Sequence, residues 1–145
     1  MRESVRRKLE SELDTRGEGE FELLLITRGR DPHKGMYAFP GGFVDYGEDP
    51  KKACLRELKE ECSVDGVEPK LITVAGDPDR DPRKHVITIV YAVQINPHAH
   101  VEAADDAATA KWYNLRQVWT NTSKYQLAFD HRAILGEFVR QYPKL

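Results

Sequence analysis

Short apolar runs separated by polar stretches dominate this chain, and their lengths predict strands with few helices. The run at 21–27 (FELLLIT) has the composition of a buried strand, and the run at 85–95 alternates enough to be half buried. Shorter runs at 71–75 and 110–115 also predict strands. Polar segments with glycine or proline predict loops between them, at 28–37, 77–84 and 97–108.

Two longer segments follow the helical period. Asp49 and Pro50 form a favourable helix start, because the acid can cap backbone N–H groups and proline fits the first helical position. A second amphipathic helix is predicted at 127–142. The first helix should run to about residue 62 and turn one stripe toward the core, made of Ala53, Cys54, Leu58 and Cys62.

The first 20 residues are charged and give an uncertain pattern. Val5, Leu9 and Leu13 repeat every four residues, which allows a short helix there. Without internal repeats or a low-complexity linker, residues 1–145 predict a single domain. Strands before and after one central helix indicate the α/β class, and specifically an α/β/α sandwich with a mixed sheet.

Composition and charge exclude several classes of function. Apolar content of 40% and charged content of 32% are ordinary for a soluble domain, and no run approaches the roughly 20 apolar residues of a membrane helix. The net charge of −2 gives no general reason to bind nucleic acid or an anionic membrane. Cys54 and Cys62 would lie about 12 Å apart on one helix, too far for a mutual disulfide. With no signal peptide pattern at the N-terminus, we expect a cytoplasmic protein.

The most informative chemistry is a cluster of acids on the first predicted helix. Glu57, Glu60 and Glu61 have i, i+3 and i+4 spacing, so their carboxylates converge on one helix face. Like charges so close repel, and a divalent cation is the simplest compensation. Mg²⁺ and Mn²⁺ prefer such oxygen ligands, whereas zinc does not. The alternative is a solvated acidic face, and the three glutamates alone do not decide between the two.

The spacing around these acids is much more specific. Gly42 is followed after five residues by Glu48, and seven further residues lead to the run RELKEE at 56–61. This pattern resembles the signature box of the Nudix hydrolases, which implies a Nudix-type α/β/α sandwich with a catalytic box on a loop–helix–loop. Ser63 departs from the family, which has glycine at the turn leaving the helix.

The resemblance implies a divalent-metal-dependent pyrophosphohydrolase that cleaves a nucleoside diphosphate linked to another moiety. It implies that Arg56 orients the glutamates through charge-assisted hydrogen bonds, and that Glu48 supports the metal from nearby. The implied cofactor is Mg²⁺ or Mn²⁺. The residues assigned to it by the resemblance are the backbone carbonyl of Gly41 and the side chains of Glu57, Glu60 and Glu61.

Flanking segments at 28–45, 76–86, 105–112 and 127–131 resemble one branch of the family, the ADP-ribose pyrophosphatases. The implied reaction converts ADP-ribose to AMP and ribose 5-phosphate. Dinucleoside polyphosphates, nucleotide sugars and oxidised nucleoside triphosphates are alternative substrates. Local ion pairs explain Arg80 and Arg83 equally well, and most aromatic residues of such a domain belong to its core. The candidates for substrate contact are Arg28, Arg30, Phe43, Arg80 and Arg83.

The general base is the least determined part of the site. In this family it is often an acid on a loop outside the box, and here Glu102, Asp105 and Asp106 are candidates in no firm order. An ordinary polar loop is the alternative. The resemblance also implies a homodimer. A distant alternative is a non-catalytic nucleotide sensor, which is disfavoured because every box glutamate is present and no chain after Leu145 is left for a DNA-binding domain.

Overall fold

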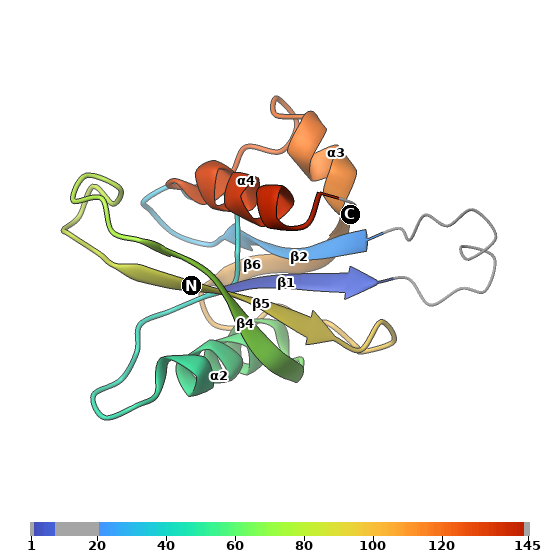
Figure 1. Cartoon of the computed structure of the whole chain (residues 1–145), viewed down its shortest axis with the longest axis horizontal. Coiled ribbons are helices and arrows are strands. Elements are labelled where there is room, and N and C mark those ends of the chain that lie inside the picture. Colours follow the sequence, from blue (N-terminus) through green and yellow to red (C-terminus); the bar gives the residue numbers. More distant parts are fainter. Residues whose placement is uncertain (1, 8–20, 144–145) are drawn as a thin grey trace.

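A six-stranded mixed β-sheet forms the centre of the molecule in a computed structural model, which describes residues 2–7 and 21–143 (Figure 1). Strand β1 runs parallel to β5, and the other strand pairs are antiparallel. Strand β6 (Ala107–Asn114) lies off the main path and pairs with β2. The main path has the order β3 (Tyr37–Ala38), β2 (Phe21–Arg28), β1 (Arg2–Arg7), β5 (Thr88–Ile95) and β4 (Gly66–Ala75).

Helices cover both faces of this sheet (Figure 1). Helix α2 (Pro50–Cys62) packs on one face, and α3 (Leu115–Thr120) with α4 (His131–Gln141) packs on the other. A hydrophobic core lies on each face of the sheet, and β2 contributes side chains to both. Leu23 and Leu25 face α3 and α4, while Leu24 faces α2. These leucines are fully buried, as expected for a strand covered on both faces. The predicted α/β/α sandwich with a mixed sheet is therefore confirmed.

The start of α2 follows the prediction closely. Asp49 is the N-cap residue, and its side chain accepts a hydrogen bond from Lys51 N at 2.8 Å. Pro50 is the first helical residue, where a missing N–H costs nothing. The helix ends at Cys62, and the capping residue Ser63 adopts the left-handed conformation with φ of 62°. The turn for which the resemblance implies glycine is therefore made here by serine.

Two predictions of helical structure are wrong in part. Val5 lies in strand β1, because its backbone pairs with both β2 and β5, while Leu9 and Leu13 lie outside the described residues. Helix α4 begins at 131 and not at 127. Residues 126–128 instead bond to Tyr37, and Phe129 takes a left-handed φ of 51°, which prevents an earlier helix start.

Other differences concern strand bounds and one helix, and β6 begins at 107 where 110 was predicted. Strand β4 begins at residue 66, five residues before the predicted start, and register shifts interrupt its pairing with β5. The short helix α3 was not predicted, although Asn114 caps it by accepting a hydrogen bond from Gln117 N at 3.0 Å. Asparagine before apolar residues at helical spacing, here Leu115 and Val118, is a known helix-start signal, so the sequence did contain this cue.

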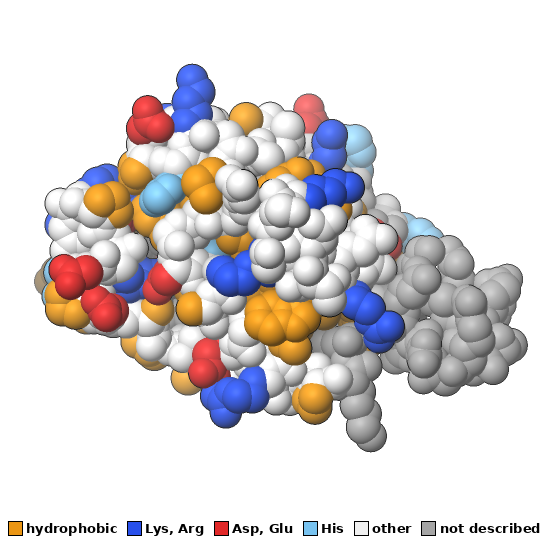
Figure 2. Space-filling model, turned by 90° about the horizontal axis from the view of Figure 1, so that it is seen from above, with side chains coloured by type: hydrophobic (Ala, Val, Ile, Leu, Met, Phe, Trp, Pro, Cys, Tyr) orange, Lys and Arg blue, Asp and Glu red, His pale blue; other side chains and the backbone are white. Residues whose placement is uncertain are grey.

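The surface on the side of α3 and α4 has mixed character. Lys and Arg side chains lie on it as separate groups among acidic, apolar and polar ones, without forming one continuous basic area (Figure 2). Among the described residues, no helix is long and apolar enough to cross a membrane.

Candidate active site

A cleft of about 820 Å³ lies between α2 and loops that connect the strands. Its lining brings together acids from α2 and arginines that lie between 28 and 83 in the sequence. Three predicted residues, Arg56, Glu48 and Glu102, are not in its lining. Arg56 bonds to two of the lining acids, and Glu48 bonds to Arg56. The predicted residues that line the cleft are Arg28, Arg30, Gly41, Phe43, Glu57, Glu60, Glu61, Arg80, Arg83, Asp105 and Asp106.

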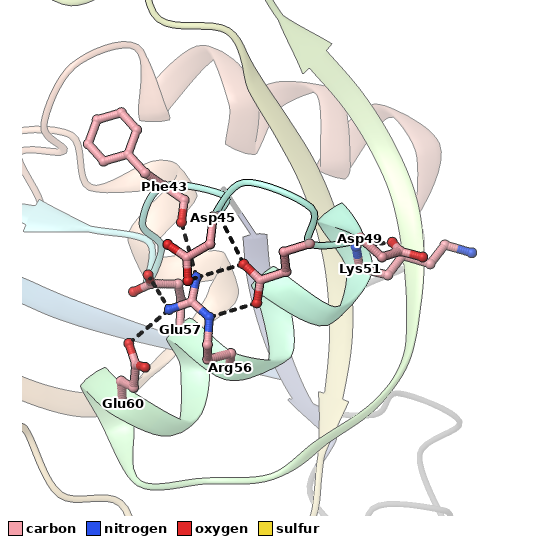
Figure 3. A network of polar contacts seen from close by, with 8 residues as sticks. Phe43, Asp45, Asp49, Lys51, Arg56, Glu57 and Glu60 are labelled. Carbon is pink, nitrogen blue, oxygen red and sulfur yellow. Dashed lines mark hydrogen bonds and ion pairs between the residues drawn. The ribbon is translucent and has the colours of Figure 1, made fainter.

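Arg56 is the hub of the acidic cluster (Figure 3). Its Nε and Nη2 donate to the two carboxylate oxygens of Glu48 at 2.7 and 2.9 Å. Its Nη1 donates to Glu57 Oε1 at 2.9 Å and to Glu60 Oε2 at 3.1 Å, and Nη2 also reaches the carbonyl of Phe43 at 3.1 Å. The Arg56 hydrogen bonds lower the pKa of Glu48 to about 2, and the same bonds raise the pKa of Arg56. One guanidinium thus offsets the repulsion and orients two cleft carboxylates.

Two glycines bring backbone against the other side of the acids. Gly41 N donates to Glu61 Oε1 at 2.8 Å, and this carboxylate belongs to a residue that is only 5% exposed. A Cβ on Gly42 would lie 2.2 Å from the carboxylate carbon of Glu57. No side chain fits at that position without moving the glutamate, so glycine is required here for close approach.

The donor set suits a divalent cation that prefers oxygen. Glu57, Glu60 and Glu61 supply carboxylates from successive turns of α2, and Gly41 brings main chain beside them. In the described part of the chain, no group of three acids, histidines or cysteines already surrounds one point. The carboxylates are directed toward Arg56 and Gly41 N instead. Carboxylate and carbonyl oxygens are the ligands that hard divalent cations prefer.

Two guanidinium groups share the ring of Phe129 in the same cleft. Arg28 Cζ lies 4.9 Å and Arg83 Cζ 5.7 Å from the ring centroid, within cation–π range. Burial lowers the pKa of Arg28, and the charge of Arg83 adds to this effect. Asp81 accepts bonds from Arg83 Nε and Nη2 at 3.0 and 2.7 Å, which lowers the pKa of Asp81 to about 2. Two adjacent cations beside one buried acid leave net positive charge that suits an anion.

Arg80 also lines the cleft, but most of its donors bond within the protein. Its Nε and Nη2 form a bidentate pair with Asp130 at 2.8 and 2.7 Å, and Nη1 reaches Thr88 Oγ1 at 2.7 Å and the carbonyl of Val86 at 3.2 Å. The side chain is only 4% exposed. Arg80 therefore ties the loop between β4 and β5 to the start of α4, and its contact with a substrate stays a prediction.

The loop before β6 is attached to the C-terminal end of α2. Glu102 N donates to the carbonyl of Cys62 at 3.1 Å, and Ala104 N donates to that of Glu61 at 2.9 Å. Ser63 Oγ adds a bond to the carbonyl of Glu102 at 3.2 Å. These contacts place the loop with the three base candidates directly beside the acidic helix.

The three base candidates differ in their surroundings. Asp105 and Asp106 line the cleft, whereas the side chain of Glu102 is 72% exposed and lies 3.7 Å from His100. Asp106 forms an ion pair with Arg30, which joins this loop to the loop after β2. Asp105 has a left-handed φ of 53°, and its side chain makes no hydrogen bond or ion pair among the described residues.

Sequence reasoning did not select two residues that shape the cleft, Phe129 and Asp81. Both lie in segments that resemble the ADP-ribose pyrophosphatases, at 76–86 and 127–131. Neither residue belongs to a motif of fixed spacing that would single it out. The role of Phe129 depends on contacts with Arg28 and Arg83, which lie about 100 and about 46 residues earlier in the chain. Only the folded arrangement reveals it.

Comparison with known proteins identifies the family. The NUDIX domain family matches residues 4–138. The chain is 39% identical over 123 residues to the ADP-ribose pyrophosphatase of Methanocaldococcus jannaschii, a match that covers 85% of this chain and 69% of that protein. The chain therefore belongs to the NUDIX domain family of hydrolases, as its sequence predicted.

Two other relatives connect the fold with ADP-ribose in different settings. The chain is 34% identical over 122 residues to the ADPR responsive transcriptional repressor NtrR of Acinetobacter baylyi, which covers 83% of this chain but only 47% of the repressor. The NUDIX domain of Shewanella oneidensis NrtR, solved in complex with ADP ribose, has a TM-score of 0.77 at 22% identity. That match covers 97% of this chain and 86% of the solved one. At this identity, the likeness concerns the fold.

Proposed function

We propose that this protein hydrolyses ADP-ribose to AMP and ribose 5-phosphate with Mg²⁺ or Mn²⁺ as cofactor. The observation that carries the proposal is one cleft lined both by the α2 carboxylates and by paired arginines. The identity of 39% to an archaeal ADP-ribose pyrophosphatase supports this choice of substrate. When bound, the cation would polarise a phosphoryl oxygen and neutralise charge that develops on the anhydride. It would be held by Glu57, Glu60, Glu61 and the carbonyl of Gly41.

The arginines around Phe129 are proposed to bind the pyrophosphate. Arg28 and Arg83 lie on one aromatic ring, and Arg30 lies at the same cleft. A guanidinium forms directional, charge-assisted bonds with phosphate oxygens, so this group can orient the anhydride relative to the acids. Phe43 is 58% exposed and lines the cleft, and Lys84 Nζ lies 5.3 Å from its ring centroid, so a base can stack on the face of the ring that Lys84 does not cover.

Asp105 is proposed as the general base. It lines the cleft, and its carboxylate is not engaged by another described residue, in contrast to Asp106, which Arg30 holds. A base must reach the attacking water directly, so an exposed side chain outside the cleft such as Glu102 is less suited. Asp105→Asn should lower kcat strongly and remove the acidic limb of the pH–rate profile. An unchanged profile would contradict the assignment.

Product analysis on a panel of substrates tests the reaction. ADP-ribose, a dinucleoside polyphosphate, a nucleotide sugar and an oxidised nucleoside triphosphate should be incubated separately with Mg²⁺ and with Mn²⁺. We expect the highest kcat/KM for ADP-ribose, with AMP and ribose 5-phosphate as products. If ADP-ribose is not turned over faster than the others, the proposed substrate is wrong.

Removal of one acid tests the metal assignment. Glu60→Gln keeps the shape of a side chain that is 44% exposed, so folding should be nearly intact while kcat falls at least about 10²-fold. Glu137→Gln on α4 is a matched control, because this glutamate also pairs with an arginine on its own helix. The control should have wild-type activity. Unchanged turnover in Glu60→Gln would refute the assignment.

A second candidate function is sensing of ADP-ribose without hydrolysis. The similarity to an ADPR responsive repressor favours it, although the chain spans only 47% of that protein. Calorimetry with ADP-ribose, followed by product analysis of the same samples, separates the two functions. Tight binding with no AMP formed in the presence of Mg²⁺ or Mn²⁺ would favour the sensor.

The choice between Mg²⁺ and Mn²⁺, a cytoplasmic location and a homodimeric state remain predictions. A small nucleotide as partner, and not a nucleic acid or membrane, is favoured by the net charge of −2. The mixed surface on the side of α3 and α4 agrees with this (Figure 2). Light scattering would test the dimer.

A further inference from the structure

His131 is a buried histidine that contacts the backbone leading into the acidic site. It is only 1% exposed, and its Nδ1 accepts a hydrogen bond from Phe39 N at 3.2 Å. The imidazole also stacks on the Phe39 ring, with centroids 5.0 Å apart and an interplanar angle of 11°. Phe39 itself is 2% exposed, so no solvent replaces this acceptor if it is removed. A buried N–H without a partner is costly, so the position of Phe39 depends on His131.

The residues directly after Phe39 are those that contact the carboxylates of α2. Gly41 N bonds to Glu61 at 2.8 Å, and the Cα of Gly42 packs so closely on Glu57 that a methyl group would not fit. Because only Pro40 separates Phe39 from Gly41, a shift at Phe39 is transmitted to both glycines. The position of the main chain at the proposed metal site therefore depends on the imidazole of His131.

The segment that leads into His131 is held by several contacts, and His131 N itself donates to the carbonyl of Ala128 at 3.1 Å. Tyr37 N donates to the carbonyl of Gln126 at 3.0 Å, and Ala128 N donates to that of Tyr37 at 2.7 Å. Arg80 forms a bidentate ion pair with Asp130, the residue before His131. The strained φ of Phe129 turns the chain between these contacts and α4. Such support fixes the direction of the imidazole and is typical of residues that orient a site.

We propose that His131 is a positioning residue, whose Nδ1 holds segment 39–42 in the geometry that the α2 carboxylates need to bind a divalent cation. This inference rests on the proposed function. An acceptor at Nδ1 leaves the ring proton on Nε2, which has no hydrogen-bond partner among the described residues. Burial lowers the pKa of His131 to about 3, so the imidazole is neutral and can accept at ordinary pH.

Three substitutions separate the two ring nitrogens. His131→Asn places an amide oxygen near the position of Nδ1, His131→Gln places its amide near Nε2, and His131→Phe keeps an aromatic ring without an acceptor. Mn²⁺ affinity is measured by titration calorimetry without substrate, and hydrogen exchange of the peptide covering 37–44 is followed in parallel. Val118→Ala is the control, because it opens a cavity under α3 in a fully buried position and destabilises the fold elsewhere.

We expect His131→Phe and His131→Gln to weaken Mn²⁺ binding by about tenfold and to speed exchange at 37–44. His131→Asn should keep affinity within about twofold of wild type, as should Val118→Ala despite its lower Tm. Equal affinity in all variants, rescue by glutamine instead of asparagine, or equal loss in Val118→Ala would overturn this inference alone. Absence of Mn²⁺ binding to the wild-type protein would overturn the proposed function, and this inference with it.

Discussion

Replacement of Gly42 by alanine should damage catalysis with little effect on folding. The new Cβ would lie 2.2 Å from Glu57 Cδ and 2.4 Å from both carboxylate oxygens, whereas ordinary contacts begin near 3.4 Å. The clash is with the end of a flexible side chain, so the glutamate will move by about 1 Å and the backbone will stay in place. A displacement of that size at a catalytic group costs about 10²-fold in rate. We expect this loss in kcat/KM for ADP-ribose, together with weaker Mn²⁺ binding.

The assay combines thermal unfolding with steady-state kinetics at increasing Mn²⁺ concentration. Gly76→Ala is the matched control, because a Cβ there meets no atom within 4 Å and its φ is not in the left-handed region. The control should match wild type in both measurements. Full activity and unchanged Mn²⁺ affinity in Gly42→Ala would refute the reasoning that close backbone approach places Glu57. A large fall in Tm would also refute it, since the strain would then lie in the fold.

Three further predictions concern stability. Ser63→Gly should raise the free energy of unfolding by up to about 1 kcal/mol in denaturant titrations, because φ of 62° is unfavourable for serine and the lost bond from Ser63 Oγ to Glu102 is exposed. Turnover should be unchanged, because two backbone bonds still attach the loop to α2. The hydrogen bond from Arg83 lowers the pKa of Asp81 from 3.8 to about 2, so this pair stabilises the fold above pH 4 and its contribution is lost as pH falls toward 2. In the Asp81→Asn variant, the urea midpoint should fall less than that of the wild type as the pH is lowered from 4 toward 2. Burial lowers the pKa of His131 from 6.5 to about 3, so as the pH falls the unfolded chain binds a proton before the folded one does. The free energy of unfolding therefore decreases as the pH falls from 6.5 toward 3, and His131→Asn should remove this pH dependence.

Local features of the sequence predicted the elements that depend on nearby residues. The helix at α2 begins where Asp49 and Pro50 indicated, and its buried stripe is the predicted one. The strand at 21–27 was predicted because five of its seven residues are apolar. Prediction from local sequence failed where contacts with a distant segment determine the backbone conformation. Helical periodicity at 127–142 is overridden at its start by backbone bonds to Tyr37, nearly 90 residues earlier.

Within the site, the sequence by itself determined the acidic helix, its spacing and the resemblance that identified the family. These depend on the helical repeat, which places Glu57, Glu60 and Glu61 on one face whatever surrounds them. Only the tertiary structure decided which groups contact these acids. Arg56 is close in sequence, but Gly41, the cations around Phe129, and His131 reach the cleft from separate elements. Such contacts arise from packing of the sheet between its helices, and no local pattern in the sequence predicts them.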